Sequence, residues 1–480
     1  MNILLTLRIL GTLLLFLSAA LLLPIPFSLF YGDGASYAFL LSAVVTFVVG
    51  LALFKGCRSQ RDLSLRDGFA IVSFSWIFYA FFGALPFYLS GAIPSFLNAS
   101  FETLSGFTTT GATILAEVES LPQSLLLWRA LTQWFGGMGI IVMSLAILPM
   151  LGIGGMQLFK AEVPGPTADR LKPRIQDTAK LLWGVYVLLT AAEVLLLMFG
   201  KMGFFESLCH SLATLATGGF STRNMSVAAY DSAYIDGVIT LFMFLAGVNF
   251  SLHYQALRGR LTEFWKNEEF RVYLGVTVAA ILVLMVVNHG TVYDSLLENL
   301  RFSSFQATSI MTTTGFGTAD YELWPIFSQY LLILLMFIGG CAGSTGGGMK
   351  VARILLLFKH AHVQLFRLIH PRAVRLVKLG NRPVNRDVMQ SILGFFALYM
   401  AVFVVASFMM AAAGMDLVSA GASVIATLGN IGPGLGSVGP TDNYGHIAPF
   451  GKGVLMFCML LGRLELFTVL VLFFPTFWRK

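Results

Sequence analysis

The chain has 480 residues, of which 57% are hydrophobic and only 11% are charged. An average soluble domain has about 25% charged residues, so this composition excludes a soluble globular protein. The four cysteines lie singly along the chain, which excludes a small disulfide scaffold. The formal net charge is +7, but the basic residues form short clusters between apolar segments, so we expect no nucleic-acid partner. Since a helix needs roughly 20 apolar residues to cross a lipid bilayer, we expect an all-α polytopic membrane protein with about ten crossings.

Two apolar segments, 3–30 and about 36–54, begin the chain and predict an N-terminal two-helix hairpin. A signal peptide would begin in the same way, but the second segment follows after a very short break, so we expect the hairpin to be uncleaved. Clusters of Lys and Arg then occupy alternate breaks between apolar segments, at 55–66, 160–180, 258–271, 367–386 and 479–480. By the positive-inside rule these breaks are cytoplasmic, and both chain termini lie on that side.

Between successive basic clusters the chain follows the same course four times, which predicts an internal repeat. Each copy has an apolar helix, a shorter semi-polar segment, a Thr/Gly-rich turn and a long apolar helix. The three expected segments are about 68–90, 97–109 and 128–152 in the first copy, 181–200, 205–216 and 232–257 in the second, 271–288, 294–312 and 325–358 in the third, and 387–413, 416–428 and 446–474 in the fourth. The short segments should enter the bilayer and return on the same side. We therefore divide the chain into the hairpin at 1–66 and pore repeats at 67–160, 161–260, 261–366 and 367–480.

The four turns share a Thr/Asn-x-Gly pattern that ends at Gly111, Gly219, Gly315 and Gly432. Irregular backbone persists at membrane depth only where it is buried in protein or lines water, and glycine allows dihedrals that turn carbonyl oxygens toward an axis. A single turn of this kind would be explained as an ordinary helix C-cap. Four of them predict a ring of carbonyls, which can replace the hydration shell of a monovalent cation. Each short helix would also direct its partially negative C-terminal end at the ion path.

The segments 105–113, 133–140, 216–221, 430–434 and 462–465 carry a resemblance that extends over nearly the whole chain. With these motifs the sequence resembles the Trk/Ktr/HKT superfamily of potassium transporters, most closely its bacterial TrkH type. The resemblance implies a pseudo-fourfold pore with one filter strand per repeat and a homodimer in the bacterial inner membrane. It also implies a cytoplasmic nucleotide-binding regulatory subunit of TrkA type, and potassium as the transported substrate with no organic cofactor on this chain.

Carried over residue by residue, the resemblance assigns the filter carbonyls to one pair in each turn: Thr110 and Gly111, Gly218 and Gly219, Thr314 and Gly315, and Ile431 and Gly432. The fourth strand departs from the threonine pattern at Asn430 and Pro433, which favours an asymmetric filter. Each strand has one common glycine, unlike the Thr-Val-Gly-Tyr-Gly strand of tetrameric potassium channels. We therefore expect fewer coordination sites and weaker discrimination against sodium.

Six glycines in ten residues, at 339–348, interrupt the third long helix. Glycine costs about 1 kcal/mol relative to alanine in a helix interior, so this run predicts an intramembrane loop that lines a water-filled cavity. Close packing of helices through small residues is the alternative. In the family that the chain resembles, the matching loop lies under the filter and obstructs the pore. We therefore expect a gate formed by Gly339, Gly340, Gly343, Ser344, Thr345, Gly346, Gly347 and Gly348.

Arg463 lies about midway in the last expected helix, between apolar residues. A charge at that depth is costly unless it faces partners or water, so Arg463 is a functional candidate. The resemblance implies that this arginine faces the pore as an electrostatic barrier to cations. The alternative is a structural salt bridge with Glu193 or Glu465. Acidic residues on the short segments, such as Glu102, are more typical of caps or loop anchors.

The basic segment from Phe358 to Arg386 either only orients the chain and attracts anionic lipid, or also docks the regulatory subunit. No motif for nucleotide hydrolysis or proteolysis is present in the sequence, so we expect no enzyme. The predicted function is potassium uptake through a selective pore gated by the loop and the regulatory subunit. Two alternatives stay open, namely the potassium-binding subunit of a potassium-pumping ATPase and a cation-coupled secondary transporter. Four turns that enter from one side, without an inverted repeat, disfavour the second.

Overall fold

Helices make up nearly all of the regular structure, as the composition predicts. The computed structural model describes residues 2–57, 64–146, 171–380 and 382–479. Its helices are α1 (Ile3–Leu21), α2 (Ile25–Tyr31), α3 (Ser36–Gly56), α4 (Leu65–Gly83), α5 (Leu85–Leu89), α6 (Phe96–Phe107), α7 (Gln123–Ala146), α9 (Leu171–Phe199), α10 (Phe204–Leu215), η2 (Ser226–Tyr230), α11 (Ala233–Ala246), α12 (Phe250–Leu257), α13 (Thr262–Lys266), α14 (Glu268–Asn288), α15 (Leu296–Met311), η3 (Tyr321–Leu323), α16 (Ile326–Met336), α17 (Val351–Ile369), α18 (Arg386–Ala412), α19 (Leu417–Leu428), η4 (Gly436–Val438), α20 (Pro449–Arg463), α21 (Phe467–Leu470), η5 (Val471–Phe473) and α22 (Pro475–Trp478). Within the described residues, the only sheet is the antiparallel pair β1 (Lys378–Leu379) and β2 (Arg382–Pro383).

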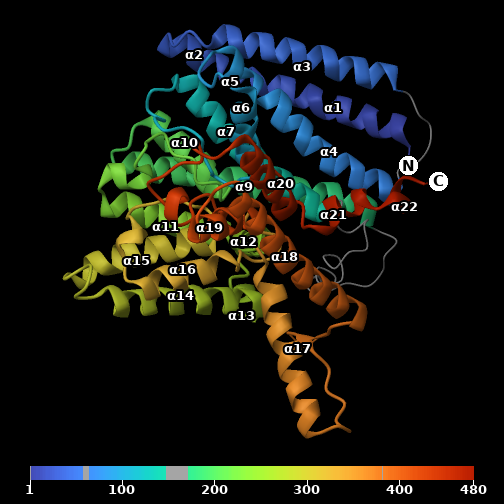
Figure 1. The fold of residues 1–480 in the computed structure, drawn as a ribbon, viewed down its shortest axis with the longest axis vertical. Helices are drawn as coiled ribbons and strands as arrows, with labels where there is room; N and C mark the ends of the chain where they lie inside the picture. Colours follow the sequence, from blue (N-terminus) through green and yellow to red (C-terminus); the bar gives the residue numbers. More distant parts are fainter. Residues whose placement is uncertain (1, 58–63, 147–170, 381, 480) are drawn as a thin grey trace.

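The N-terminal hairpin is formed by α1 and α3, with α2 between them (Figure 1). The two long helices approach closely at a pair of glycines, since a Cβ atom added to Gly50 would lie 3.0 Å from the carbonyl oxygen of Gly11. The Ser18 hydroxyl donates to the Ala43 carbonyl at 2.8 Å, so this polar group is paired within the hairpin. α1 also packs against α4, which joins the hairpin to the first repeat.

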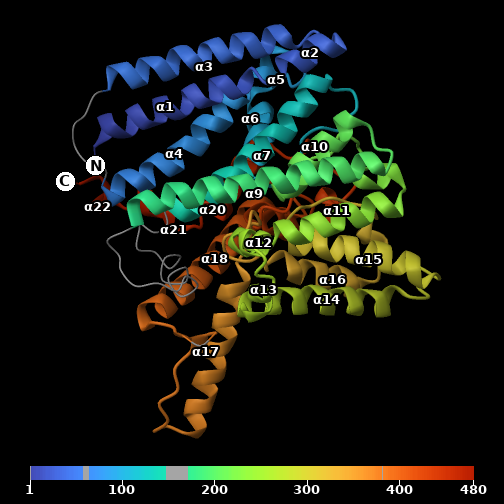
Figure 2. The ribbon, with the colours of Figure 1, turned by 180° about the vertical axis from the view of Figure 1, so that it is seen from behind.

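The four predicted repeats close into a ring. Their short re-entrant helices are α6, α10, α15 and α19, and the helices that follow them are α7, α11, α16 and α20. Each following helix packs against the short helix of the next repeat, in the pairs α7–α10, α11–α15, α16–α19 and α20–α6. Figures 1 and 2 show the resulting order, in which the C-terminal repeat returns to lie beside the first. The short helices therefore share one centre, as the repeat pattern predicts.

The prediction of one continuous long helix in the second and fourth repeats is wrong. The chain bends by 104° between α11 and α12 and by 113° between α20 and α21. Gly247 and Asn249 lie at the first bend, and Glu465 and Leu466 have positive φ at the second. In the third repeat the predicted interruption is present, because α16 ends at Met336 and α17 begins at Val351. The expected end of the first long helix, 147–152, and the basic residues at 160–170 lie outside the described residues.

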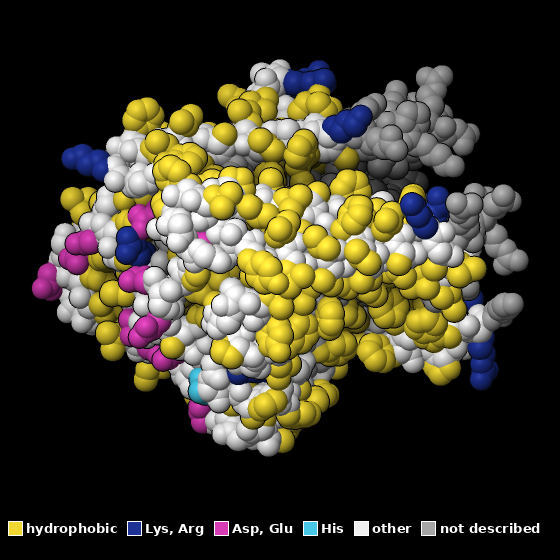
Figure 3. All heavy atoms as spheres, turned by 90° about the horizontal axis from the view of Figure 1, so that it is seen from above, with side chains coloured by type: hydrophobic (Ala, Val, Ile, Leu, Met, Phe, Trp, Pro, Cys, Tyr) yellow, Lys and Arg dark blue, Asp and Glu magenta, His cyan; other side chains and the backbone are white. Residues whose placement is uncertain are grey.

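The surface and the helix lengths fit a membrane protein. Among the described residues, six helical segments are long and apolar enough to cross a bilayer, or eight if each bent pair forms one span. The two remaining expected crossings are α7, which leads into the undescribed segment, and α16, which has 11 residues before the glycine loop. Figure 3 shows hydrophobic side chains over the middle of the molecule, acidic side chains together with some Lys and Arg at the left end, and Lys and Arg without acidic side chains at the right end. An end with only basic side chains agrees with a cytoplasmic membrane side there.

Candidate ion pathway

All four short helices end in the same backbone turn. Positive φ angles of 51°, 52°, 61° and 54° occur at Thr109, Thr217, Thr313 and Asn430. The amide that follows each of these residues donates to the carbonyl five positions earlier, at 2.8–2.9 Å in all four turns. This is a helix C-cap, but a β-branched residue in the left-handed conformation costs about 1–3 kcal/mol, where glycine would cost little. Each turn is thus a C-cap, and the two residues that follow its left-handed residue, the second of which is the glycine of the pattern, extend beyond the helix end.

The four glycines of the pattern complete a ring with their neighbours. Each has a positive φ, between 77° and 99°. A Cβ atom added to any of them would lie less than 3.0 Å from a carbonyl oxygen of the next repeat. The contacts run from Gly111 to Gly218, from Gly219 to Thr314, from Gly315 to Ile431 and from Gly432 to Thr110. The structure therefore brings together all eight residues predicted to supply filter carbonyls, and only glycine fits at four of them.

A cavity of about 80 Å³ lies at this ring and is lined by residues of all four repeats, including the four glycines. Arg223 and Asp442 also line the cavity. The Arg223 guanidinium is 2.6 Å from the Glu206 carboxylate, and this carboxylate is the main cause of the raised pKa of Arg223. The cationic side chain at this entrance is therefore paired with an acid, which reduces its repulsion of an approaching cation.

Side chains from outside the turns hold the filter strands. The Gln133 side-chain amide donates to the Gly218 carbonyl at 2.6 Å, and its oxygen accepts from the Phe220 amide at 3.0 Å. The Tyr444 hydroxyl donates to the Gly432 carbonyl at 2.6 Å. The roles of both side chains were missed from the sequence. Gln133 lies in a motif that carries the family resemblance, whereas no sequence signal marks Tyr444.

The fourth strand differs from the others in its contacts, as predicted. The Asn430 side chain donates to the Thr110 hydroxyl at 2.9 Å and to the Met459 carbonyl at 3.0 Å. In the first and third strands the hydroxyls of Thr108 and Thr110, and those of Thr312 and Thr314, pair with each other at 2.8 and 2.7 Å. The second and fourth strands lack this pair of hydroxyls. Hydroxyl pairs within the strand therefore stabilise the first and third strands, whereas Gln133 and Tyr444 from outside the turns hold the second and fourth.

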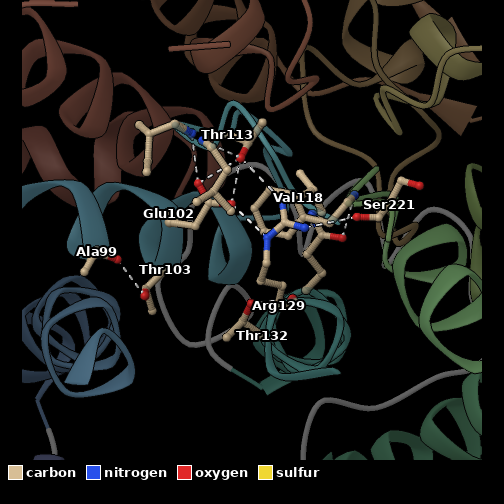
Figure 4. A network of polar contacts seen from close by, with 12 residues as sticks. Ala99, Glu102, Thr103, Thr113, Val118, Arg129, Thr132 and Ser221 are labelled. Carbon is tan, nitrogen blue, oxygen red and sulfur yellow. Dashed lines mark hydrogen bonds and ion pairs between the residues drawn. The ribbon is translucent and has the colours of Figure 1, made fainter. Parts of the chain in front are cut away.

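A buried ion pair within the first repeat lies beside the filter and is hydrogen-bonded to the second repeat (Figure 4). The Arg129 Nε lies 2.9 Å from Glu102 Oε1, and the two side chains are 3% and 0% exposed. Glu102 also accepts from the Thr113 hydroxyl at 2.9 Å and from the Ile114 amide at 2.9 Å. Arg129 donates in addition to the Ser221 carbonyl at 3.0 Å. The predicted role of Glu102 as a loop anchor is therefore confirmed, and the anchored segments are those that follow the first two filter strands.

The glycine loop at 339–348 lies against the C-terminal ends of the short helices. The Gly347 amide donates to the Thr313 hydroxyl at 2.6 Å, and the Thr345 hydroxyl donates to the Leu215 carbonyl at 2.9 Å. A Cβ atom added to Gly347 would also meet the Gly429 carbonyl. The loop thus contacts the ends of three of the four short helices. Thr345 and Ser344 are buried, at 0% and 3% exposed.

The bend between α11 and α12 holds the other side of the glycine loop. The Cys341 amide donates to the Gly247 carbonyl at 2.8 Å, and the Phe250 amide donates to the Gly343 carbonyl at 3.1 Å. The loop closes on itself where the Gly339 amide donates to the Met349 carbonyl at 2.8 Å. The bend that sequence reasoning missed therefore provides backbone groups that the loop needs, since an unpaired amide at membrane depth is costly.

Arg463, at the end of α20, reaches across to the same loop. Its guanidinium donates to the Thr345 carbonyl at 2.7 Å and to the Gly136 carbonyl at 3.1 Å, and the residue is 2% exposed. Among the described residues it forms no ion pair with Glu193 or Glu465, so the salt-bridge alternative is not found. Glu465 is instead paired with Arg353 at 2.5 Å. Arg463 therefore contributes both a positive charge and a tether between the loop and α7.

Comparisons with known proteins agree with this geometry. The model of the TrkH family, described as cation transport protein, matches residues 35–480. The chain is 46% identical to the Trk system potassium uptake protein TrkH of Salmonella typhimurium, covering 98% of this chain and 99% of that protein. It is 35% identical to the Trk system potassium uptake protein TrkG of Escherichia coli, covering 98% and 97%.

A solved structure has the same fold. The crystal structure of the potassium transporter TrkH from Vibrio parahaemolyticus superposes with a TM-score of 0.92 at 41% sequence identity, covering 100% of both chains. This likeness and the family match both extend through the four repeats. The chain belongs to the TrkH family of cation transport proteins.

Proposed function

We propose that this protein carries potassium ions into the cell through a selective pore at the centre of its four repeats. The observation that carries this proposal is the closed ring in which each pattern glycine faces a carbonyl of the next repeat. Carbonyl oxygens at fixed positions can replace the hydration shell of a potassium ion. The printed names of the relatives, which describe potassium uptake, support potassium as the substrate.

The filter carbonyls in this proposal come from Thr110, Gly111, Gly218, Gly219, Thr314, Gly315, Ile431 and Gly432. The C-terminal ends of four short helices point at the ring, and their partial negative charge favours a cation there. The Gly218 and Gly432 carbonyls each already accept one hydrogen bond, from Gln133 and Tyr444. Those bonds fix the strands but weaken two of the ligands, which fits the expected modest discrimination against sodium.

The glycine loop at 339–348 is the proposed gate, and Arg463 is its electrostatic barrier. The loop's contacts with three short-helix ends support an obstructing position below the filter. Arg463 binds the loop through the Thr345 carbonyl, so its charge lies where a cation leaving the filter would pass. Opening then requires the loop to leave Arg463 and Thr313 together.

A cytoplasmic partner is proposed to control this gate. α17 follows the loop directly and projects from the body of the molecule (Figures 1 and 2). Its far end exposes both apolar and basic side chains, with Leu368 at 79% and Ile369 at 74% exposure near Arg367. Such a surface suits a protein contact, which supports a homodimer and a nucleotide-binding regulatory subunit of TrkA type. We place the protein in the bacterial inner membrane with cytoplasmic termini and the repeat boundaries given above.

The test is ion flux through the purified chain in proteoliposomes. Potassium, rubidium, sodium and lithium are compared for the native protein, for Gly219→Ser and for Gly203→Ser. A Cβ atom at Gly219 would meet the Thr314 carbonyl, whereas one at Gly203, at the other end of the same short helix, has no neighbour within 4 Å. We expect native and Gly203→Ser flux to favour potassium and rubidium, and Gly219→Ser to lose flux or admit sodium.

Three results would contradict the proposal. Unchanged selectivity in Gly219→Ser would contradict the filter assignment. Native flux that requires an imposed proton or sodium gradient would instead support a cation-coupled secondary transporter. Flux that appears only when an ATP-hydrolysing chain is added would support the pump-subunit alternative.

A further inference from the structure

A groove opens on the surface between α11, α14 and α15, away from the ion pathway. It has a volume of about 490 Å³, and its lining is mainly apolar. The side chains along it include Leu241, Phe244, Val278 and Leu297, and Gly237 leaves room at one edge. Leu241 and Leu297 are 52% and 78% exposed, so the groove opens outward from the helices. α15 packs against both α11 and α14, and Figure 2 shows these helices in the same part of the molecule. This apolar channel is of the kind that an acyl chain fills.

One end of the groove is charged. Asp236, in the first turn of α11, and Arg301, on α15, both line it and are paired at 2.7 Å. Arg301 also lies 3.2 Å from Asp231, whose side chain is 89% exposed. Asp236 is only 2% exposed. The second oxygen of its carboxylate, Oδ1, is buried and has no hydrogen-bond partner among the described residues. An unpaired buried carboxylate oxygen is costly and signals a missing donor.

We propose that this groove is a binding site for one membrane phospholipid with an ethanolamine headgroup. The apolar part holds an acyl chain. The Arg301 guanidinium binds the headgroup phosphate, and the ammonium group donates to the carboxylates of Asp231 and Asp236. Two carboxylates against one guanidinium give the site a net negative charge, which disfavours an anionic glycerol headgroup. A choline headgroup carries the same charge as ethanolamine but has no N–H donor for these oxygens.

The site also has a route to the filter. Thr308 of α15 lines the groove, and its carbonyl accepts the amide of Thr312 at 2.9 Å. Thr312 lies at the end of that short helix, directly before the left-handed residue Thr313. A bound acyl chain therefore packs against the last turns of the short helix that carries the third filter strand.

The experiment measures lipid binding to the delipidated full-length protein by native mass spectrometry. Equal amounts of phosphatidylethanolamine, phosphatidylcholine and phosphatidylglycerol compete for the native chain and three variants. Gly237→Leu fills the groove, because a Cβ atom at Gly237 has no neighbour within 4 Å and the residue lines the groove. Gly275→Leu is the matched control, since Gly275 is also an open helical glycine but does not line the groove. Asp231→Asn tests the headgroup contact at an exposed side chain.

We expect native protein and Gly275→Leu to retain phosphatidylethanolamine about tenfold over the other lipids, equivalent to about 1.4 kcal/mol. Gly237→Leu should lose most of this binding, and Asp231→Asn should keep lipid but lose the headgroup preference. Equal binding of the three lipids by the native chain would overturn the proposal, as would full phosphatidylethanolamine binding by Gly237→Leu. A change of oligomeric state in Gly237→Leu without loss of lipid would show that a second copy covers the groove, and would overturn it too.

Discussion

Replacement of Arg463 tests the tether between the glycine loop and the rest of the pore. Its guanidinium makes two buried hydrogen bonds, to the carbonyls of Thr345 and Gly136. A hydrogen bond to a charged group contributes about 1.5–3 kcal/mol. If the loop leaves Arg463 on opening, Arg463→Ala removes at least one such bond from the closed state alone. At about 1.4 kcal/mol per factor of ten, the ratio of open to closed protein should rise about tenfold to a hundredfold.

The assay is initial rubidium influx into proteoliposomes at matched protein density, for the native chain, Arg463→Ala and Arg463→Lys. Lysine keeps the positive charge but cannot bind two carbonyls in the planar geometry of a guanidinium. If influx in Arg463→Lys lies between the values for the native chain and for Arg463→Ala, both the hydrogen bonds to the carbonyls and the positive charge restrict flux. Native-like influx in Arg463→Lys would show that the positive charge alone restricts flux. Native-like influx in a folded Arg463→Ala protein would refute both roles.

Three further substitutions test the filter, the buried ion pair and the anchor of the glycine loop. Gly315→Ala should lower the selectivity for potassium over sodium by about tenfold or more, because the added Cβ atom meets a carbonyl of the fourth strand. Reversal potentials measure this selectivity. Gly317→Ala is the control and should leave the selectivity unchanged, because a Cβ atom at Gly317 has no neighbour within 4 Å. Glu102→Gln should lower the melting temperature, because it leaves a buried arginine charge unpaired at a cost of about 3–5 kcal/mol, and an unchanged melting temperature would contradict this. The Glu269 carboxylate accepts a hydrogen bond from the loop amide of Ala342 at 2.7 Å. Glu269→Leu should therefore loosen the loop and raise rubidium influx. Lower influx in a folded Glu269→Leu variant would argue against this anchor.

The periodic features of the sequence were sufficient for the architecture. Apolar segment lengths, alternating basic clusters and four similar turns predict the hairpin, the re-entrant helices and the ring, because each depends on local composition and on the cost of unpaired backbone in a membrane. The Thr/Asn-x-Gly pattern was informative because its first and third residues both adopt positive φ. The glycine run predicts the interruption after Met336 because glycine is unfavourable in a helix interior.

The missed features depend on contacts between distant parts of the chain. The bends at Gly247 and beside Arg463 lie inside segments that are apolar on average, and both are in contact with the glycine loop, through the backbone at the first bend and through the Arg463 side chain at the second. Tyr444 reaches the Gly432 carbonyl from a segment without any motif. The partners of Arg463 are backbone carbonyls, which no residue pattern can identify.

Binding of one potassium ion by carbonyls from all four repeats can be tested with rubidium-soaked crystals. Rubidium replaces potassium at such a site and gives anomalous diffraction that locates the ion. We expect an anomalous peak on the axis within the ring of Thr110, Gly218, Thr314 and Ile431 carbonyls, and its loss in Gly315→Ala. A crystal with full rubidium occupancy elsewhere in the protein and none within this ring would contradict it.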